Sequence, residues 1–158
     1  EIVSWTHSDL QCDINDILIV YNLYKSKLLN GDCIVKGKRI HRKLVDSFFS
    51  NSMAILASIL FNKKFREINA QPKVFSKNLL KEFYNAPKDF SLDLYLLYIS
   101  KLKSYKIIEH PVVYKKRLAG ISKGGDSFFG KIKLTLRTLK YIINLRINSH
   151  DSHNSQNK

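Results

Sequence analysis

The sequence predicts an α/β fold, with helices packed on one sheet. Segments rich in β-branched and aromatic residues alternate along the chain with segments that repeat apolar residues at helical spacing. The chain has 158 residues, of which 44% are hydrophobic, so it is long enough to bury the core of one domain. Only about three strands are expected, which is few for this class of fold. We therefore expect the sheet to be incomplete.

The first element is a short strand, Ile2 to Trp5, which breaks into a cluster of polar side chains that ends at Asp13. Polar clusters after a strand commonly hold metal or phosphate ligands in α/β enzymes. Asp13 can cap a helix that ends near Leu29, with Asp16 three residues on as a variant of the capping box. The apolar stripe expected on this helix is Ile14, Ile17, Leu18, Tyr21 and Leu28.

The next elements are a strand and a long helix. A turn at Asn30 to Asp32 leads into the strand Cys33 to Arg39, which ends in a basic corner. Lys43 to Phe61 has apolar residues at helical spacing and predicts a mostly buried helix. Phe65 to Phe75 contains Pro72, which lacks an amide donor, so it predicts an edge strand or a strand broken by a turn.

The last part of the chain continues the alternation. We expect a short helix at Lys77 to Tyr84, then an apolar helix entered through Asp89 to Asp93. Lys106 to Lys115 predicts another strand, placed at an edge by its Pro111. A glycine-rich basic loop, Arg117 to Gly125, separates it from a basic amphipathic helix, Ser127 to Ile147. The polar tail from Ser149 predicts disorder.

Charge and composition limit the classes of function. The net charge is +14, and Lys101 to Arg146 alone holds 12 Lys and Arg against 2 acids. This excess implies an anionic partner: a phosphorylated substrate, a membrane surface or a nucleic acid. The best candidate for a membrane span, Ser47 to Asn62, is too polar and favours a buried helix. Cys12 and Cys33 have no metal-site spacing and fit a reducing cytosolic compartment.

Two groups of residues have the chemistry of a binding site. Asp9, Gln11 and Asp13 offer hard oxygen ligands that suit Mg²⁺ or Mn²⁺ on a nucleotide diphosphate. The alternative is that these aspartates form a turn or cap a helix. Arg117 and Lys123 could grip a diphosphate on the glycine-rich loop. The loop lacks the pattern of a P-loop, so an ordinary solvated loop is the alternative there.

Five motifs in order resemble the landmarks of a family 2 glycosyltransferase, in particular dolichol-phosphate-mannose-synthase-like and polyprenyl-phosphate-glucosyltransferase-like enzymes. They are Thr6 to Asp13, Val35 to Arg39, Glu67 to Phe75, Asp89 to Asp93 and Arg117 to Lys123.

This resemblance extends from Glu1 to about Arg146 and implies the acceptor-side half of a Rossmann-like GT-A domain over residues 1–126. The basic helix would occupy 127–147 and the polar tail 148–158. The N-terminal nucleotide-binding βαβ half of the family would be missing. Because the chain begins at Glu1 rather than Met, we expect a fragment of a longer protein, inactive alone.

The resemblance assigns roles to residues of the first two motifs. Asp9 matches the second acid of the DxD-type motif and would bind the metal, with Gln11 assisting. His7 replaces the first acid of that motif, and Asp13 falls at a helix-cap position. Arg39 matches an arginine that meets the acceptor phosphate. An ordinary surface arginine is its alternative.

The later motifs supply the remaining expected site residues. Glu67 falls where relatives place an aspartate near the sugar and acceptor, and Asp93 falls at the position of a general base. The alternative for Asp93 is a first-turn carboxylate favoured by the helix dipole. Arg117, Ser122 and Lys123 match a loop that closes over the donor diphosphate, where a cation stabilises the charge of the leaving group.

The resemblance implies an inverting enzyme that moves a sugar from a nucleotide-sugar donor to a polyprenyl phosphate. One alternative acceptor is a saccharide hydroxyl in cell-envelope assembly. Another alternative is a basic nucleic-acid-binding module, which explains the charge but not the acidic turn at Asp9 and lacks an RNP1-like motif. The basic helix suggests peripheral contact with an anionic membrane at the cytoplasmic face. A helix packed on the domain is its alternative.

Overall fold

The computed structural model describes residues 1–9, 11–40, 44–89 and 91–115, with the backbone alone at 44–50, and single residues between 130 and 145. The elements in chain order are β1 (Ile2–Trp5), α1 (Asn15–Asn30), β2 (Cys33–Ile40), α2 (Leu44–Phe61), β3 (Lys73–Ser76), the 3₁₀ helix η1 (Lys77–Phe83), α3 (Leu92–Leu102) and β4 (Lys106–Val113). The expected basic loop at Arg117 to Gly125 and the polar tail lie outside the described residues.

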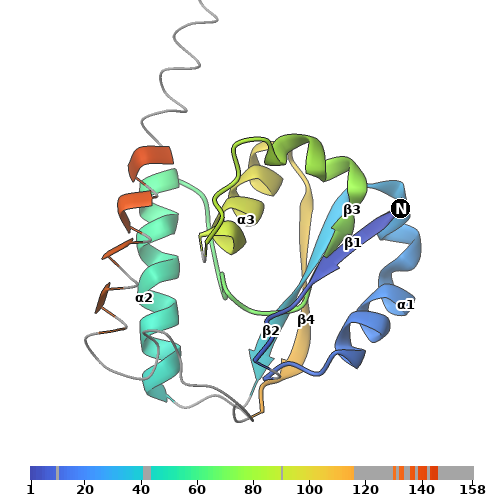
Figure 1. Ribbon diagram of the computed structural model, residues 1–158, viewed down its shortest axis with the longest axis horizontal. Helices are drawn as coiled ribbons and strands as arrows, with labels where there is room; N and C mark the ends of the chain where they lie inside the picture. The colour runs from blue at the N-terminus through green and yellow to red at the C-terminus, as the bar shows by residue number, and fades with distance from the viewer. Residues whose placement is uncertain are drawn as a thin grey trace, which may run out of the picture.

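The four strands form one mixed sheet in the order β1-β3-β2-β4 (Figure 1). β3 runs antiparallel to both of its neighbours, whereas β2 and β4 are parallel. β1, β2 and β4 therefore point the same way, and their carboxyl ends meet at one edge of the sheet. The α/β prediction is confirmed, and the four strands overlap the four segments named as strands, where a total of about three was expected.

Of the two alternatives for the segment around Pro72, the edge strand is wrong, and a turn at Ile68 and Asn69 precedes the short strand that forms. β3 begins at Lys73, directly after the proline, and lies between β1 and β2. Pro72 stays outside the ladder and uses only its carbonyl, which accepts a hydrogen bond from the Gly37 amide at 2.9 Å. The second proline prediction is confirmed, because β4, which contains Pro111, is the last strand of the sheet.

α1 begins two residues after the expected cap and ends one residue later than expected. Ile14 occupies the N-cap position without a side-chain bond, while the carboxylate of Asp13 accepts a hydrogen bond from the Asn15 amide at 3.0 Å. The predicted stripe is wrong in part. Val20 and Leu28 face the sheet, but Ile14 and Leu18 are 65% and 60% exposed.

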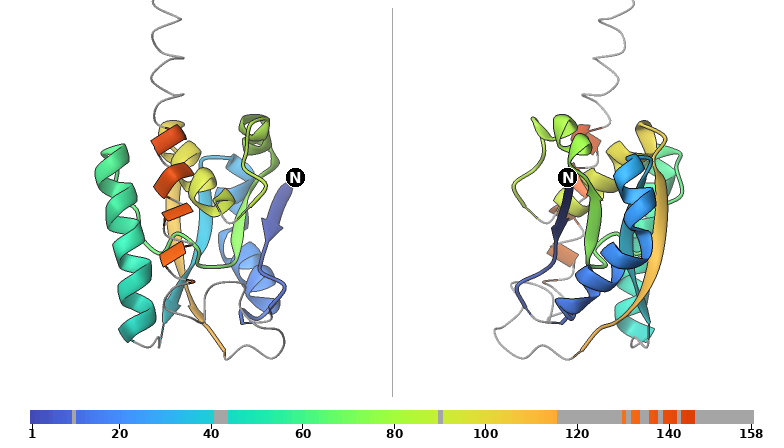
Figure 2. Two further views of the ribbon diagram at one scale, coloured as in Figure 1. Left: turned by 60° about the vertical axis from the view of Figure 1, so that its left-hand side comes forward. Right: turned by 90° about the vertical axis from the view of Figure 1, so that its right-hand side faces the viewer.

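Apolar side chains fill both faces of the sheet, because successive residues of a strand point to opposite sides. On one side, Val20 and Leu28 of α1 pack on Cys33 and Val35 of β2. On the other side, α2, α3 and the chain between them cover Ile34 and a larger cluster that includes Phe75, Leu94, Leu96 and Leu97. Figures 1 and 2 show α1 alone on its face and α2 and α3 on the opposite one.

In the part of α2 whose side chains are described, residues 51–61, the expectation of a mostly buried helix holds for one side only. Ala54 and Ala57 are buried, whereas Ile55 and Ile59 are 58% and 70% exposed. The described residues between 132 and 145 lie beside α2 (Figures 1 and 2). Within the described residues, no helix is both long enough and apolar enough to cross a membrane.

Two described residues of the expected basic helix contact the domain. Leu145 lies against the larger core cluster, and Arg137 pairs with Asp89 at 2.9 Å. Ile132, Leu136 and Ile143 are nevertheless exposed. The described residues therefore fit the packed alternative and still leave an apolar outer side.

Candidate functional site

The candidate site lies at the edge of the sheet where β1, β2 and β4 end. Trp5 is the last residue of β1, Arg39 is near the end of β2, and Tyr114 follows β4. Because β3 is antiparallel, its first residue, Lys73, reaches the same edge. In open α/β sheets, the carboxyl ends of the strands are where ligands bind.

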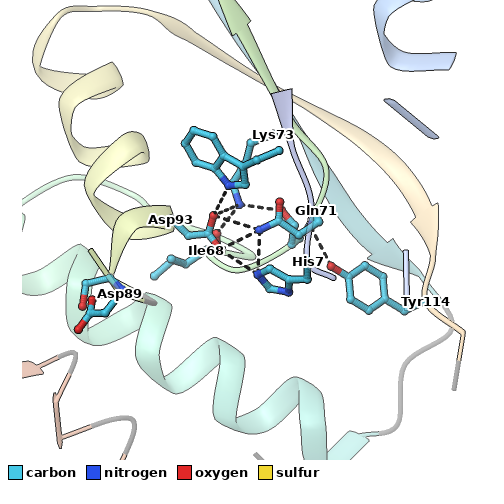
Figure 3. A network of polar contacts seen from close by, with 10 residues as sticks. His7, Ile68, Gln71, Lys73, Asp89, Asp93 and Tyr114 are labelled. Atoms are coloured by element: carbon cyan, nitrogen blue, oxygen red, sulfur yellow. Dashed lines mark hydrogen bonds and ion pairs between the residues drawn. The ribbon is translucent and has the colours of Figure 1, made fainter. Parts of the chain in front are cut away.

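Asp93 is the centre of a buried polar network at this edge (Figure 3). It lies in the first turn of α3 and is 5% exposed. One carboxylate oxygen accepts hydrogen bonds from Trp5 Nε1 at 3.1 Å and Lys73 Nζ at 3.2 Å. Gln71 Nε2 lies 3.0 Å and 2.9 Å from the two carboxylate oxygens. The carboxylate is thus surrounded by donors.

Lys73 is buried and supplies the counter-charge. Besides Asp93, its ammonium donates to the carbonyls of Ile68 at 2.9 Å and Ala70 at 2.7 Å. All three protons of the ammonium therefore have acceptors, which is the condition under which a buried lysine is tolerated. The lysine ties α3 to the segment that precedes β3.

The charge state of this pair follows from its surroundings. Burial raises the pKa of Asp93, but Lys73 and the hydrogen bonds from His7 and Trp5 outweigh it and hold the pKa well below its usual range. Burial lowers the pKa of Lys73 to about 8, although Asp93 opposes the shift. At neutral pH the pair is ionised. A carboxylate stabilised in this way is a weak base.

Gln71 connects the network to β4. Its backbone amide donates to the Tyr114 hydroxyl at 2.9 Å, and its Oε1 atom is buried without a hydrogen-bond partner. The peptide bond between Gln71 and Pro72 is cis. The segment passes directly over Gly37, where an added Cβ would lie 1.9 Å from the Gln71 carbonyl oxygen. Gly37 is therefore required for this close approach.

The structure brings together two residues that the sequence analysis placed in different motifs. Arg39 Nε donates to Glu67 Oε2 at 2.6 Å, and both side chains are largely buried. The Arg39 guanidinium also lies over the Tyr114 ring, 5.4 Å from its centroid. Arg39 is thus a fixed residue of the site edge, which does not fit its alternative as an ordinary surface arginine.

The expected metal ligands lie on the turn after β1. Asp9 accepts a hydrogen bond from the Gln11 amide at 3.2 Å, and the Gln11 side chain donates to the Lys115 carbonyl at 3.5 Å. Asp13 pairs with Lys115 at 3.0 Å, so it serves the turn and the helix start. Among the described residues, no three His, Cys, Asp or Glu side chains gather as a metal site.

The donor set on this turn fits a metal ion that is held mostly by a substrate. Asp9 and Gln11 supply one carboxylate and one amide, and Mg²⁺ is commonly bound by one or two carboxylates together with substrate phosphates and water. Burial and Asp16 raise the pKa of the neighbouring Cys12 thiol to about 12, so the chain by itself keeps this thiol protonated. The residues present therefore suit a hard cation.

The side chain of His7 lies against the buried network around Asp93. Its Nε2 atom lies 3.1 Å from Gln71 Nε2 and 3.6 Å from Asp93 Oδ2 (Figure 3). A histidine in place of an acid avoids a second negative charge beside Asp93. This arrangement gives His7 a structural role in the network around Asp93.

The sequence analysis did not assign site roles to Trp5, Gln71, Lys73 and Tyr114. The strongest sequence signal for this network was Lys73, which directly precedes the apolar Val74 and Phe75. A lysine that is buried with such residues needs an acid as partner. Nothing in the spacing marked Trp5 or Tyr114. Arg117, Ser122 and Lys123, expected at the donor diphosphate, lie outside the described residues.

No family model, curated protein or solved structure matches this chain.

Proposed function

We propose that the chain is the acceptor-side half of an inverting glycosyltransferase of the GT-A type, using a nucleotide-sugar donor and a polyprenyl phosphate acceptor. The observation that carries this proposal is the meeting of four sequence motifs at one edge of the sheet. Trp5 and His7, Arg39, Glu67 with Gln71 and Lys73, and Asp93 are distant in sequence and connected by hydrogen bonds and ion pairs. The edge is where an α/β sheet binds nucleotides and phosphates.

The state of Asp93 favours the lipid phosphate over a sugar hydroxyl as acceptor. A hydroxyl acceptor needs a general base, which contributes about 10² to 10⁴ in rate. Asp93 is buried, paired with Lys73 and held below the usual carboxyl pKa, so it is poorly suited to take a proton. A phosphate oxygen is already ionised near neutral pH and needs no base. With a phosphate acceptor, Asp93 serves to hold Trp5, Gln71 and Lys73 in place at the edge of the sheet.

Arg39 is the best-placed residue for the acceptor phosphate. Its guanidinium is oriented by Glu67 on one side and by the Tyr114 ring below. A guanidinium carries five N–H donors in a fixed fork, which matches a phosphate group, and in Arg39 the Nε atom donates to Glu67 Oε2. Glu67 thus acts by holding Arg39. It is not required to handle a proton.

A divalent cation fits the donor side of this proposal. Asp9 and Gln11 would hold Mg²⁺ or Mn²⁺ against the diphosphate, where the ion would offset charge on the leaving group. The chain's own contribution is the fixed turn, since Lys115 binds both Gln11 and Asp13. Arg117, Ser122 and Lys123 remain predicted partners of the same diphosphate.

The nucleotide-binding half is proposed to join at β1. Among the described residues, β1 pairs only with β3, so its outer edge can accept a further strand. Beside it, Ile2, Leu18, Tyr21 and Leu29 line an open groove of about 350 Å³ between β1 and α1. The exposed Leu18 would be covered by the added half.

Peripheral membrane contact is part of the proposal, because a polyprenyl acceptor resides in a membrane. Ile55 and Ile59 of α2 are exposed, and so is Leu136 on the segment that lies beside α2. Lys133 and Arg137 on the neighbouring segment are also exposed. Apolar and basic residues together suit the headgroup layer of an anionic membrane.

The direct test measures release of nucleoside diphosphate by a protein that joins this chain to its nucleotide-binding half. The expected result is turnover with polyprenyl phosphate and a nucleotide sugar, and none by residues 1–158 alone. Arg39→Lys should raise the KM for polyprenyl phosphate about tenfold or more, because the bidentate fork is lost. Lys88→Gln, a change of an exposed lysine outside the site, is the control.

Two outcomes would overturn this proposal. Turnover with a saccharide acceptor and with no lipid phosphate would identify a hydroxyl-directed enzyme. Sugar transfer by residues 1–158 alone would contradict the need for a second half.

A further inference from the structure

A second basic region lies on the α2 and α3 side of the sheet, away from the groove at β1. It is an open pocket of about 270 Å³ between β2, β4, α3 and the chain that follows α2. Leu97 and Phe65 form its apolar walls. The proposed transfer reaction assigns no role to this pocket, although Lys36 of its lining lies within the motif Val35 to Arg39.

Cations dominate the lining of the pocket. Lys36, Lys64, Arg66 and Lys101 contribute four positive charges. Glu109 is the single acid of the lining. Among the described residues Lys64 and Arg66 form no ion pair with any carboxylate, and both are exposed. The pocket therefore holds positive charge that the described chain does not neutralise.

Lys36 lies at the bottom of the pocket and is 2% exposed. Its ammonium donates to the Glu67 carbonyl at 3.3 Å and pairs with Glu109 at 3.0 Å. An ammonium has three donors, and these two contacts account for two of them. As far as the described part of the chain shows, one donor is left for a ligand in the pocket. Burial lowers the pKa of Lys36, against the effect of Glu109, and an added anion would oppose that shift further.

The rim of the pocket is partly ordered. Lys101 lies over the ring of the buried Phe65, with Nζ 5.7 Å from the centroid. This contact fixes the lysine at the mouth, between α3 and the segment that carries Lys64 and Arg66. The cations of the pocket thus come from three parts of the chain, namely β2, the segment after α2, and α3.

We propose that this pocket binds a phosphate monoester dianion. A compact, multiply charged anion can contact the buried Lys36 and the rim cations together. Arg66 supplies the planar fork that suits phosphate oxygens, and the lysines act as point charges. Phe65 and Leu97 can cover the apolar part of the esterified group.

The test is a titration of the 158-residue chain with inorganic phosphate and with glycerol 3-phosphate, followed by amide NMR shifts and calorimetry at fixed ionic strength. Vesicles containing phosphatidate, whose headgroup is the same monoester, form a second arm. The Lys64→Gln/Arg66→Gln variant is compared with Lys81→Gln/Lys88→Gln. The control variant loses the same charge from exposed positions outside the pocket.

The expected result is saturable binding, with shifts at Lys64, Arg66 and Lys101 and affinity at least about tenfold lower in Lys64→Gln/Arg66→Gln. Binding in the soluble arm identifies a free metabolite, and binding in the vesicle arm alone identifies a lipid headgroup. No saturable binding in either arm would overturn the proposal. An equal loss in the control variant would also overturn it, since general attraction by the basic chain would then explain the binding.

Discussion

The two buried lysines, Lys73 and Lys36, are on adjacent strands and belong to opposite kinds of site. Lys73 donates to Asp93 and to two carbonyls, and its partner is as buried as the lysine. Lys36 pairs with Glu109, which is partly exposed, and borders an open pocket. Lys73 is surrounded by protein groups, whereas Lys36 borders a pocket that opens to solvent. A buried charge thus marks a structural joint in one case and a ligand site in the other.

The largest expected effect is the loss of the closed pair. Lys73→Met would leave Asp93 as an uncompensated buried charge and should lower the free energy of unfolding by about 3–5 kcal/mol. Urea denaturation of the chain checks this value. A loss below about 1 kcal/mol would show that water or another cation reaches Asp93.

A glycine at the crossing of two segments is expected to matter almost as much. Gly37→Ala would place a Cβ against the Gln71 carbonyl, a backbone group that cannot rotate away. We expect a loss of about 2–4 kcal/mol in the free energy of unfolding, together with a changed environment of the Asp93 network. Gly130→Ala, in the helical segment beside α2, is a control with the same chemistry at a distant position.

Acid should weaken the closed pair in a defined range. The pKa of Asp93 is lowered in the folded chain, so its stabilisation is complete above the unfolded carboxyl pKa of about 4 and is lost as the pH falls below that value. The slope from this one group is at most about 1.4 kcal/mol per pH unit. Denaturation midpoints between pH 6 and 2 measure it, and the Lys73→Met/Asp93→Asn double variant should show a shallower decline.

The smallest effect on stability is expected at the open lysine. Lys36→Met removes the partner of Glu109, but that carboxylate can turn to water, so we expect a loss of about 1 kcal/mol. The comparison with Lys73→Met is the informative quantity. Equal losses in the two variants would mean that both lysines are structural, and they would weaken the case for a ligand in the pocket.

Most of the fold could be predicted from local pattern. The helices α1, α2 and α3 and the strand β2 follow from apolar spacing and turn residues, which act over a few positions. The place of β3 could not be predicted from Pro72, because a proline directly before a strand costs no ladder hydrogen bond. The exposure of Ile14 and Leu18 on α1 was also not predicted. Periodicity shows that a helix has an apolar side, but it does not show which of those apolar residues the sheet covers.

Several residues of the candidate site could be predicted from the sequence, but the contacts between them could not. Asp93, Glu67 and Arg39 were named from motif order, yet the sequence does not show that Glu67 holds Arg39 or that Lys73 neutralises Asp93. Those contacts join residues 20 or more positions apart, so they depend on the order of strands in the sheet. Trp5 and Tyr114 were missed for the same reason.

Trp5 is the only tryptophan of the chain. Its indole donates to Asp93, and its ring packs edge-on against Phe75 and Phe83. Its fluorescence therefore reports on the closed network and on the core beside it, whereas the lining of the basic pocket around Lys36 contains no tryptophan. A single emission spectrum can thus tell whether a change made anywhere in the chain has disturbed the site edge, before any activity is measured.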